Sequence, residues 1–155
     1  MRKLLTLVLG FAAVFGMTVV AAAEGGHTPD QLKAFVGKAA DYYKSEGRDK
    51  ALVVFSDPKG AFVEGDLYLV VMDATDGKLT MLAHGVNKGL IGKPQIDVKD
   101  PEGKAFNQQT AAALATDGDF WVSYMWPNPA TKKIAKKSTY FLRVGDVIIG
   151  AGMYE

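Results

Sequence analysis

The first strong pattern in the chain is an apolar stripe with helical spacing. Thr28 supplies a capping hydroxyl, Pro29 stands at the first helical position, and Gln31 follows three residues after the cap. The apolar residues that recur at helical spacing after this start are Leu32, Phe35, Val36, Ala39, Ala40 and Tyr43. The pattern predicts a helix that begins after Thr28 and ends near Gly47, since glycine readily adopts the left-handed conformation that closes a helix.

A short apolar run at residues 51–55 follows, and its pattern is compatible with two structures. Asp49 is placed to cap a short helix through these residues, whereas the consecutive β-forming residues 52–55 also suit a strand. The periodicity of so short a run does not decide between helix and strand. The Asp-Pro-Lys-Gly sequence at 57–60 then predicts a turn.

The middle of the chain predicts a hairpin followed by a long irregular segment. Residues 67–73 are apolar on both faces, as in a central strand that is covered on each side. Residues 78–84 return as the partner strand after a turn at 74–77. The segment 86–97 contains two glycines and a proline, which indicates irregular backbone.

A charged turn at 97–104 leads into a helix rich in small residues at 106–116. Asp97 and Asp100 stand three residues apart in this turn. That spacing is compatible with a cation site or with capping of the helix that follows, and capping is the interpretation that we favour.

The last third of the chain predicts a three-stranded antiparallel meander. An aromatic run at 120–126 is stopped by the Pro-Asn-Pro sequence at 127–129, because proline cannot donate a hydrogen bond to a strand ladder. The second and third runs, 137–144 and 147–154, are joined by the tight Gly-Asp turn at 145–146.

Strand alternation divides the side chains of this meander between two faces. In the first strand the residues of one face are Val122, Tyr124 and Trp126, and those of the other are Trp121, Ser123 and Met125. In the second strand Lys137 shares a face with Thr139 and Phe141, so an ammonium group lies among residues that should point at apolar surroundings. Such a lysine requires an anion. A register slip of one residue would bring Lys136, Ser138 and Tyr140 to that face instead.

The order of these sequences carries a resemblance to a known family. The C-terminal spacing is W-x-x-Y-x-W-P-N-P-x-T-x-K, followed by K-S-T-Y-F and V-G-D-V-I-I-G-A-G-M-Y. Residues 68–73, the turn at 76–77, and residues 82–84, 90–93 and 100–106 precede it in matching order. Together they resemble the single Cache domains of bacteria, which are extracytoplasmic relatives of PAS sensor domains. The resemblance covers residues 28–155.

The resemblance implies an α+β fold of the PAS/Cache type, in which a long N-terminal helix packs on a five-stranded antiparallel sheet and short helices and a loop cover one face. It also favours the helix at 51–55. In such folds the segment after the first hairpin, here 86–97, wraps over the open face of the sheet and encloses a small cavity. Cache relatives commonly bind small organic ligands such as short carboxylates or amino acids.

Six residues are candidates for binding such a ligand, and they are His84, Trp121, Tyr124, Trp126, Lys137 and Tyr140. Imidazole, indole, phenol and ammonium groups can all donate hydrogen bonds to a carboxylate. His84 ends a predicted strand and is the only histidine inside the predicted folded body.

The first 23 residues predict a signal peptide that is removed. Arg2 and Lys3 precede an apolar run at 4–20, and the alanines at 21–23 suit signal peptidase. An uncleaved membrane anchor is the competing interpretation, because the run approaches the length of a spanning helix. Cleavage predicts a single domain at 24–155, periplasmic or secreted and without a membrane span.

Composition excludes several other classes of protein. The full chain has 18 Lys and Arg against 17 Asp and Glu, and loss of Arg2 and Lys3 changes the balance to −1, which argues against a nucleic-acid partner. The chain has no cysteine, and it lacks the nucleophile-elbow, P-loop and dinucleotide-binding motifs. We therefore predict no enzyme activity, no metal site and no cofactor.

These observations predict an exported sensor-type domain that recognises a small organic anion such as a short carboxylate. We expect no membrane helix or output domain beyond Glu155, so signalling is expected to use a membrane-bound partner or a homodimer. The alternative prediction is a periplasmic structural or protein-interaction module on the same scaffold, without a ligand pocket.

Overall fold

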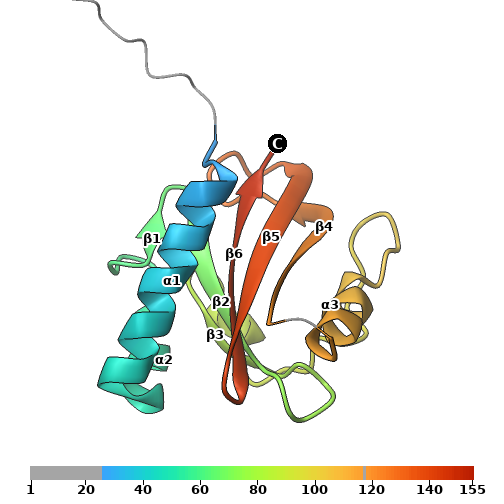
Figure 1. Cartoon of the computed structure of the whole chain (residues 1–155). Helices are drawn as coiled ribbons and strands as arrows, with labels where there is room; N and C mark the ends of the chain where they lie inside the picture. The colour runs from blue at the N-terminus through green and yellow to red at the C-terminus, as the bar shows by residue number, and fades with distance from the viewer. Residues whose placement is uncertain (1–25, 117) are drawn as a thin grey trace, which may run out of the picture.

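The computed structural model describes residues 26–116 and 118–155, which form three layers (Figure 1). Helices α1 (Pro29–Glu46) and α2 (Arg48–Phe55) pack on one face of an antiparallel sheet. Helix α3 (Phe106–Leu114) lies over the other face. The predicted signal peptide, residues 1–23, lies outside the described residues. Among the described helices, none combines the length and the apolar character needed to cross a membrane.

The sheet between the helical layers has six strands. Their bounds are Val63–Glu64 (β1), Leu67–Asp73 (β2), Met81–His84 (β3), Asp119–Pro127 (β4), Ile134–Val144 (β5) and Val147–Tyr154 (β6). The order is β1-β2-β6-β5-β4, and β3 pairs with the same edge of β2 as the two-residue β1. The predicted α+β class and antiparallel sheet are confirmed. The additional strand is β1, which is too short to leave a pattern in the sequence.

Helix α1 begins and ends where its sequence predicts. The backbone N–H of Gln31 donates to Thr28 Oγ1 (3.2 Å), and the backbone N–H of Thr28 donates to Gln31 Oε1 (2.8 Å), which completes the capping box. Gly47 closes the helix at φ 84°, a conformation that favours glycine. The buried stripe that faces the sheet is Leu32, Phe35, Val36, Ala39 and Ala40.

Residues 48–55 form helix α2, so the helix is the correct choice between the two structures that the sequence allowed. The prediction that Asp49 caps this helix is wrong. Gly47 ends α1 and also precedes α2, and no side chain caps the second helix. Asp49 therefore already lies inside the first helical turn.

The segment between β3 and α3 follows the edge of the sheet. The backbone N–H of Gly92 donates to the carbonyl of Met81 (2.8 Å), and the N–H of Met81 donates to the carbonyl of Lys93 (3.0 Å). A short 3₁₀ turn, η1 (Lys88–Leu90), precedes this pairing. The outer edge of β3 is thus covered by backbone, which holds the segment over the open face of the sheet.

Asp100 fastens the next turn to strand β4. Its Oδ1 accepts the backbone N–H groups of Glu102 (3.0 Å) and Lys104 (2.8 Å), and its Oδ2 accepts that of Met125 (3.1 Å). The hydrogen bond from Met125 and those from the turn hold the pKa of Asp100 below its ordinary value. No side chain caps helix α3, so the capping role predicted for Asp97 and Asp100 is wrong.

Two apolar cores lie on opposite faces of the sheet. The core under α1 and α2 contains a cluster of four rings, with centroids 4.8 to 5.9 Å apart, formed by Phe35, Tyr42, Phe55 and Phe62. The core under α3 is also aromatic and includes Phe106, Phe120, Tyr124 and Phe141. The second core contains the cavity described below, so the first is expected to supply most of the stability.

The ring cluster gives a direct test of this expectation. Phe55 is fully buried in the first core, and Phe55→Ala is expected to lower the free energy of unfolding by about 3–5 kcal/mol. Val53 lies on the same helix with 73% of its surface exposed, so Val53→Ala is expected to change it by less than about 0.5 kcal/mol. Urea unfolding of both variants measures the difference, and equal effects would contradict the assignment of the core.

Candidate functional site

Strand β5 directs Lys137 into the second core. Lys137 pairs with Tyr124 of β4 on one side and with Tyr154 of β6 on the other. Because side chains alternate along a strand, Thr139 and Phe141 point to the same face as Lys137. Only 2% of the surface of Lys137 is exposed. The face predicted for this ammonium group is therefore the one that the structure shows.

Two glycines of β6 make room for this side chain and for its neighbour Phe141. A Cβ at Gly152 would lie 2.2 Å from Lys137 Cε and 2.6 Å from Thr139 Oγ1. A Cβ at Gly150 would lie 2.4 Å from a ring carbon of Phe141. These distances are shorter than any ordinary contact, so the backbone of β6 serves as the floor on which both side chains lie.

An oriented chain of hydrogen bonds begins at Lys137. Its Nζ donates to the Tyr68 hydroxyl (2.8 Å), and the hydroxyls of Tyr68 and Tyr154 lie 3.2 Å apart. Tyr154 donates its proton to the carbonyl oxygen of Pro127 (3.0 Å). Each phenol carries a single proton, so Tyr68 donates to Tyr154. The N–H groups of Lys137 that take no part in this series of hydrogen bonds can donate to a ligand.

The environment of Lys137 disfavours its charge. Burial lowers its pKa to about 7, and the negative charge of Asp66 opposes this shift. In the part of the chain that the structure describes, no carboxylate lies within 4.0 Å of Nζ. The ammonium instead lies over the ring of Tyr68, 4.0 Å from its centroid, and 5.1 Å from that of Tyr154. Aromatic faces attract the cation but do not neutralise it.

His84 stands at the end of β3 and stacks on Tyr68, with ring centroids 5.0 Å apart. Its Nδ1 accepts the backbone N–H groups of Val86 (3.3 Å) and Asn87 (3.1 Å), so the proton of the neutral ring is on Nε2. Burial, and then the charge of Lys137, lower the pKa of His84 to about 4. The ring is therefore neutral at physiological pH and can donate one hydrogen bond through Nε2.

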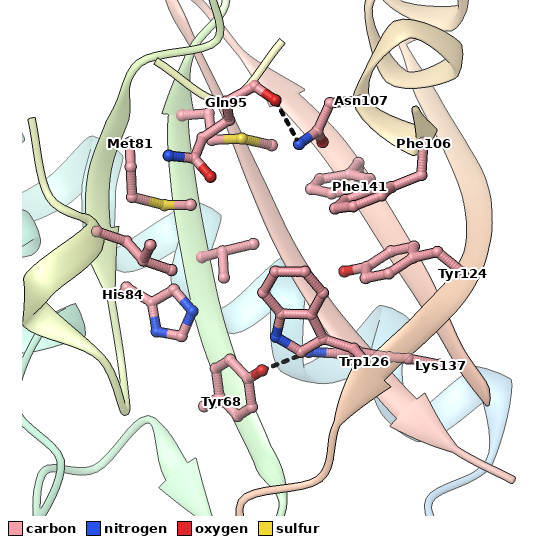
Figure 2. A pocket seen from close by; sticks show the side chains of 13 residues that line it. Tyr68, Met81, His84, Gln95, Phe106, Asn107, Tyr124, Trp126, Lys137 and Phe141 are labelled. Atoms are coloured by element: carbon pink, nitrogen blue, oxygen red, sulfur yellow. Dashed lines mark hydrogen bonds between the residues drawn. The ribbon is translucent and has the colours of Figure 1, made fainter. Parts of the chain in front are cut away.

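A small cavity lies beside Lys137 (Figure 2). It has about 30 Å³ of space for the centres of water-sized molecules, which is room for about two waters. Its apolar wall includes Met81, Phe106 and Phe141. Its polar lining is Tyr68, His84, Gln95, Asn107, Tyr124 and Lys137. Figure 2 shows Gln95 and Asn107 at one end of the cavity and Tyr68 and Lys137 at the other.

A larger groove of about 280 Å³ adjoins the cavity on its outer side. Tyr68, His84, Leu90 and Trp126 line both spaces. The Trp126 indole is half-buried and makes an edge contact with Phe106 at 5.7 Å between ring centroids. A molecule that enters from the groove must therefore pass Trp126 and Leu90.

Comparison with known protein families decides the classification. The model of the family described as single Cache domain 2 matches residues 39–155. The chain belongs to this family. A comparison of this Cache domain with curated proteins finds no match.

Solved structures share the fold of this Cache domain. A methyl-accepting chemotaxis protein from Vibrio parahaemolyticus RIMD 2210633 superposes with a TM-score of 0.67 at 22% identity, covering 81% of this chain and 86% of the other. The periplasmic sensor domain of a chemotaxis protein gives 0.59 at 22% identity, with coverages of 79% and 86%. A Cache chemosensory domain, described as showing the structural basis for carboxylic acid recognition, gives 0.60 at 22% identity, with coverages of 79% and 84%.

Four of the six candidate residues of the Cache domain line the cavity, namely His84, Tyr124, Trp126 and Lys137. The other two, Trp121 and Tyr140, do not reach it. They pair across β4 and β5 on the opposite face, where Trp121 is 38% exposed and Tyr140 packs in the first core. The Tyr140 hydroxyl donates to Asp119 (3.0 Å), and burial raises its pKa to about 12.

The sequence prediction missed several residues that line the cavity. Tyr68 could have been found, because it alternates with Val70 and Met72 along a strand recognised as apolar on both faces. Gln95 and Asn107 left no such signal, since they lie in an irregular segment and at the start of α3. Within residues 26–116 and 118–155, no group of three or more His, Cys, Asp or Glu side chains is arranged to hold a metal ion.

The close approach of Lys137 to Gly152 can be tested by one methyl group. Gly152→Ala is expected to lower the free energy of unfolding by about 1–3 kcal/mol and to displace the ammonium group, because the added Cβ overlaps Lys137 Cε. Gly37→Ala is the control, since a Cβ there meets nothing within 4 Å; in the interior of α1 it is expected to stabilise by roughly 0.5–1 kcal/mol. Thermal and urea unfolding of both variants measure this, and an unchanged stability of Gly152→Ala would contradict the described packing.

Proposed function

We propose that this Cache domain is an exported sensor module that binds a small organic anion, most simply a short carboxylate, next to Lys137. One observation carries the proposal: an ammonium group that is 98% buried faces a cavity and, in the described part of the chain, has no carboxylate within ion-pair distance. Burying an unpaired charge costs several kcal/mol. A bound carboxylate would supply the missing partner.

The donors around the cavity support recognition of a carboxylate in particular. Lys137 has N–H groups beyond the one given to Tyr68, and His84 can donate through Nε2. The indole N–H of Trp126 is a third donor at the mouth of the cavity. Hydrogen bonds from charged donors to carboxylates are stronger than neutral ones, so Lys137 is expected to dominate the affinity.

The size of the cavity limits the ligand and its affinity. The space holds about two waters, so an acid of two or three carbons is expected to bind by displacing Trp126 or Leu90 toward the outer groove. A very small ligand gains at most about 1.5 kcal/mol per heavy atom, so a four-atom acid reaches a Kd on the order of tens of micromolar. Such an affinity suits a sensor that responds to changes in concentration.

The proposal includes the cellular setting that the sequence predicts. The module would act in the periplasm or outside the cell after removal of residues 1–23. Its output would pass to a membrane-bound signalling partner or through a homodimer, and no catalysis is proposed. Calorimetric titration of the domain with C2–C5 acids tests the binding step, and a failure of every acid to bind would favour the structural or protein-interaction module.

Replacement of Lys137 separates the loss of stability caused by burying its ammonium group from the role of that group in carboxylate binding. Lys137→Met is expected to abolish carboxylate binding and to stabilise the unliganded domain at about pH 6. The folded pKa, about 7, lies below the ordinary value of 10.5. Between these values the unfolded chain binds more protons, so wild-type stability rises with pH and the advantage of methionine shrinks toward about pH 10.

Lys136→Met is the matched control for this substitution. Lys136 is half exposed, pairs with Glu155 (2.7 Å), and lies next to Lys137 on the opposite face of β5. Its replacement is expected to leave acid binding and the pH dependence of stability unchanged. Urea unfolding at about pH 6 and about pH 9.5, together with calorimetry, measures both quantities, and retained binding by Lys137→Met would overturn the proposed role of the ammonium.

The affinity itself is expected to depend on pH. Lys137 is charged below about pH 7, whereas His84 is neutral and the ligand is ionised above about pH 5. The Kd should therefore be nearly constant between about pH 5 and about pH 7. Above pH 7 free Lys137 loses its proton, and the Kd should rise toward about tenfold per pH unit. Calorimetry at about pH 8 in buffers of different ionisation enthalpy should show uptake of close to one proton per ligand. An affinity independent of pH between about 6 and 9 would contradict this coupling.

A further inference from the structure

The amino group of Lys137 has the surroundings of a nucleophile as well as those of a buried cation. The side chain is only 2% exposed and lines the small cavity (Figure 2). No carboxylate of the described residues lies within ion-pair distance of Nζ to hold a proton on it. Removal from water favours the unprotonated amine, and this is the form of lysine that attacks carbonyl carbons. The pKa of Lys137, which burial lowers to about 7, agrees with this geometry.

The hydrogen bonds of two tyrosines leave the lone pair of this amine available. Tyr154 donates to the carbonyl oxygen of Pro127 (3.0 Å), so the single proton of Tyr68 goes to Tyr154 (3.2 Å). Tyr68 therefore accepts from Lys137 Nζ (2.8 Å) and has no proton to donate to it. Because the groups around an amine nitrogen are tetrahedral, the lone pair of the free amine is directed away from Tyr68.

The stem of Lys137 is already ordered by the strand beneath it. A Cβ at Gly152 would lie 2.2 Å from Lys137 Cε and 2.9 Å from its Cγ, so the stem lies directly on the backbone of β6. The ring of Tyr68 lies 4.0 Å from Nζ, measured to its centroid. A lysine that is held in this way loses little further side-chain entropy when a bond forms at Nζ.

The proposed carboxylate contact decides which carbon of a ligand comes beside this nitrogen. A carboxylate that is held at Nζ brings carbon 2 of the acid close to the same atom, because carbon 2 is bonded directly to the carboxylate carbon. Reacting atoms that are placed about 3–3.5 Å apart are in a near-attack arrangement. Carbon 2 of an ordinary acid is saturated and does not react with an amine. In a 2-oxo acid it is a carbonyl carbon, and no reach across the cavity is required.

We propose that Lys137 forms a reversible imine with carbon 2 of a short 2-oxo acid, so that this Cache domain recognises a carbonyl group together with a carboxylate. The inference rests on the proposed binding of a carboxylate beside Lys137 and narrows the ligand to one chemical class. It also adds a covalent step to a site for which no catalysis is proposed.

The step needs no partner other than the amine and the acid. Nζ attacks carbon 2, the N–C bond forms, and the π electrons of the carbonyl pass to its oxygen, which takes one proton from the nitrogen. The C–O bond of this carbinolamine then breaks, and the oxygen leaves as water with the second N–H proton while the C=N bond forms. Nothing is oxidised or reduced. If the imine nitrogen gains a proton, the adjacent carboxylate is its counter-ion, and His84 can donate to that carboxylate through Nε2.

The imine fits the size of the cavity and adds to the affinity. Loss of water makes the bound ligand one heavy atom smaller than the free acid, in a space that holds about two waters. Pyruvate and isobutyrate have the same number of heavy atoms and differ in a carbonyl oxygen and a methyl group. In calorimetric titrations pyruvate is expected to bind roughly tenfold or more tightly than isobutyrate, because only pyruvate gains a covalent bond.

Reductive trapping identifies the lysine that forms the imine. Sodium cyanoborohydride converts an imine into a stable secondary amine, so glyoxylate leaves a carboxymethyl group on the lysine that bound it. With limiting glyoxylate at about pH 7, peptide mapping by mass spectrometry is expected to find this group on Lys137 roughly tenfold or more ahead of the exposed lysines. The same chain unfolded in urea is the control, because Lys137 should then react like the other lysines.

Two variants of β5 locate the reaction. Lys137→Met is expected to lose the fast labelling, and Lys136→Met is expected to retain it, because Lys136 is half exposed on the opposite face of the strand. Circular dichroism establishes that both variants are folded. The peptide map of the wild-type protein stands as a test without either variant.

The outcomes separate this inference from the function on which it rests. If isobutyrate or another plain acid binds and Lys137 of the folded protein is labelled no faster than the exposed lysines, the imine is overturned and carboxylate binding is left intact. Fast labelling that persists in urea or in Lys137→Met would overturn it as well. If no plain acid binds and Lys137 shows no preference, the carboxylate function and this inference both fail.

Discussion

A buried ammonium group is the constraint on which the second core of this Cache domain depends. Lys137 enters that core from the middle of the sheet, between strands that supply aromatic faces and a glycine floor. Its hydrogen bond to Tyr68 fixes the proton order through Tyr154 to the backbone of Pro127. These groups hold the cation in place and stabilise it only in part, and its pKa is correspondingly low.

The two faces of the sheet divide stability and recognition between them. The face under α1 is filled by the apolar stripe of that helix and by a cluster of four aromatic rings. The face under α3 combines an aromatic core with a cavity, a buried lysine and an amide oxygen without a donor. The unfavourable groups are gathered on one side, and the well-packed core on the other side offsets their cost.

Much of the fold follows from local patterns, and so does the central residue of the site. The capping box at Thr28 and the alternation in β5 are local, so they predict the start of α1 and the inward face of Lys137. Alternation also separates Tyr140 from Lys137, since an odd number of residues apart means opposite faces. Tyr140 would reach the site only after a register slip of one residue, and Trp121 lies on the face opposite Trp126.

What the sequence could not predict depends on contacts between distant segments. The amide of Asn107 is oriented by a carbonyl in the segment before α3. Asp100 accepts a hydrogen bond from the backbone of the edge strand β4, which is distant from it in the sequence. Neither partner is visible in local spacing. Asp49 is a different case, because Gly47 ends α1 and also occupies the N-cap position of α2, two residues before the expected cap.

The bare floor of β6 also bears on how such a domain could change over generations. At positions 150 and 152 one base change in a glycine codon can add a side chain, and even the smallest would intrude on Phe141 or Lys137. Few mutations therefore separate a receptor that has this cavity from a scaffold that lacks it. Retention of both glycines across descendants would mark lineages in which natural selection still maintains the hollow, and their replacement would mark lineages that had abandoned it.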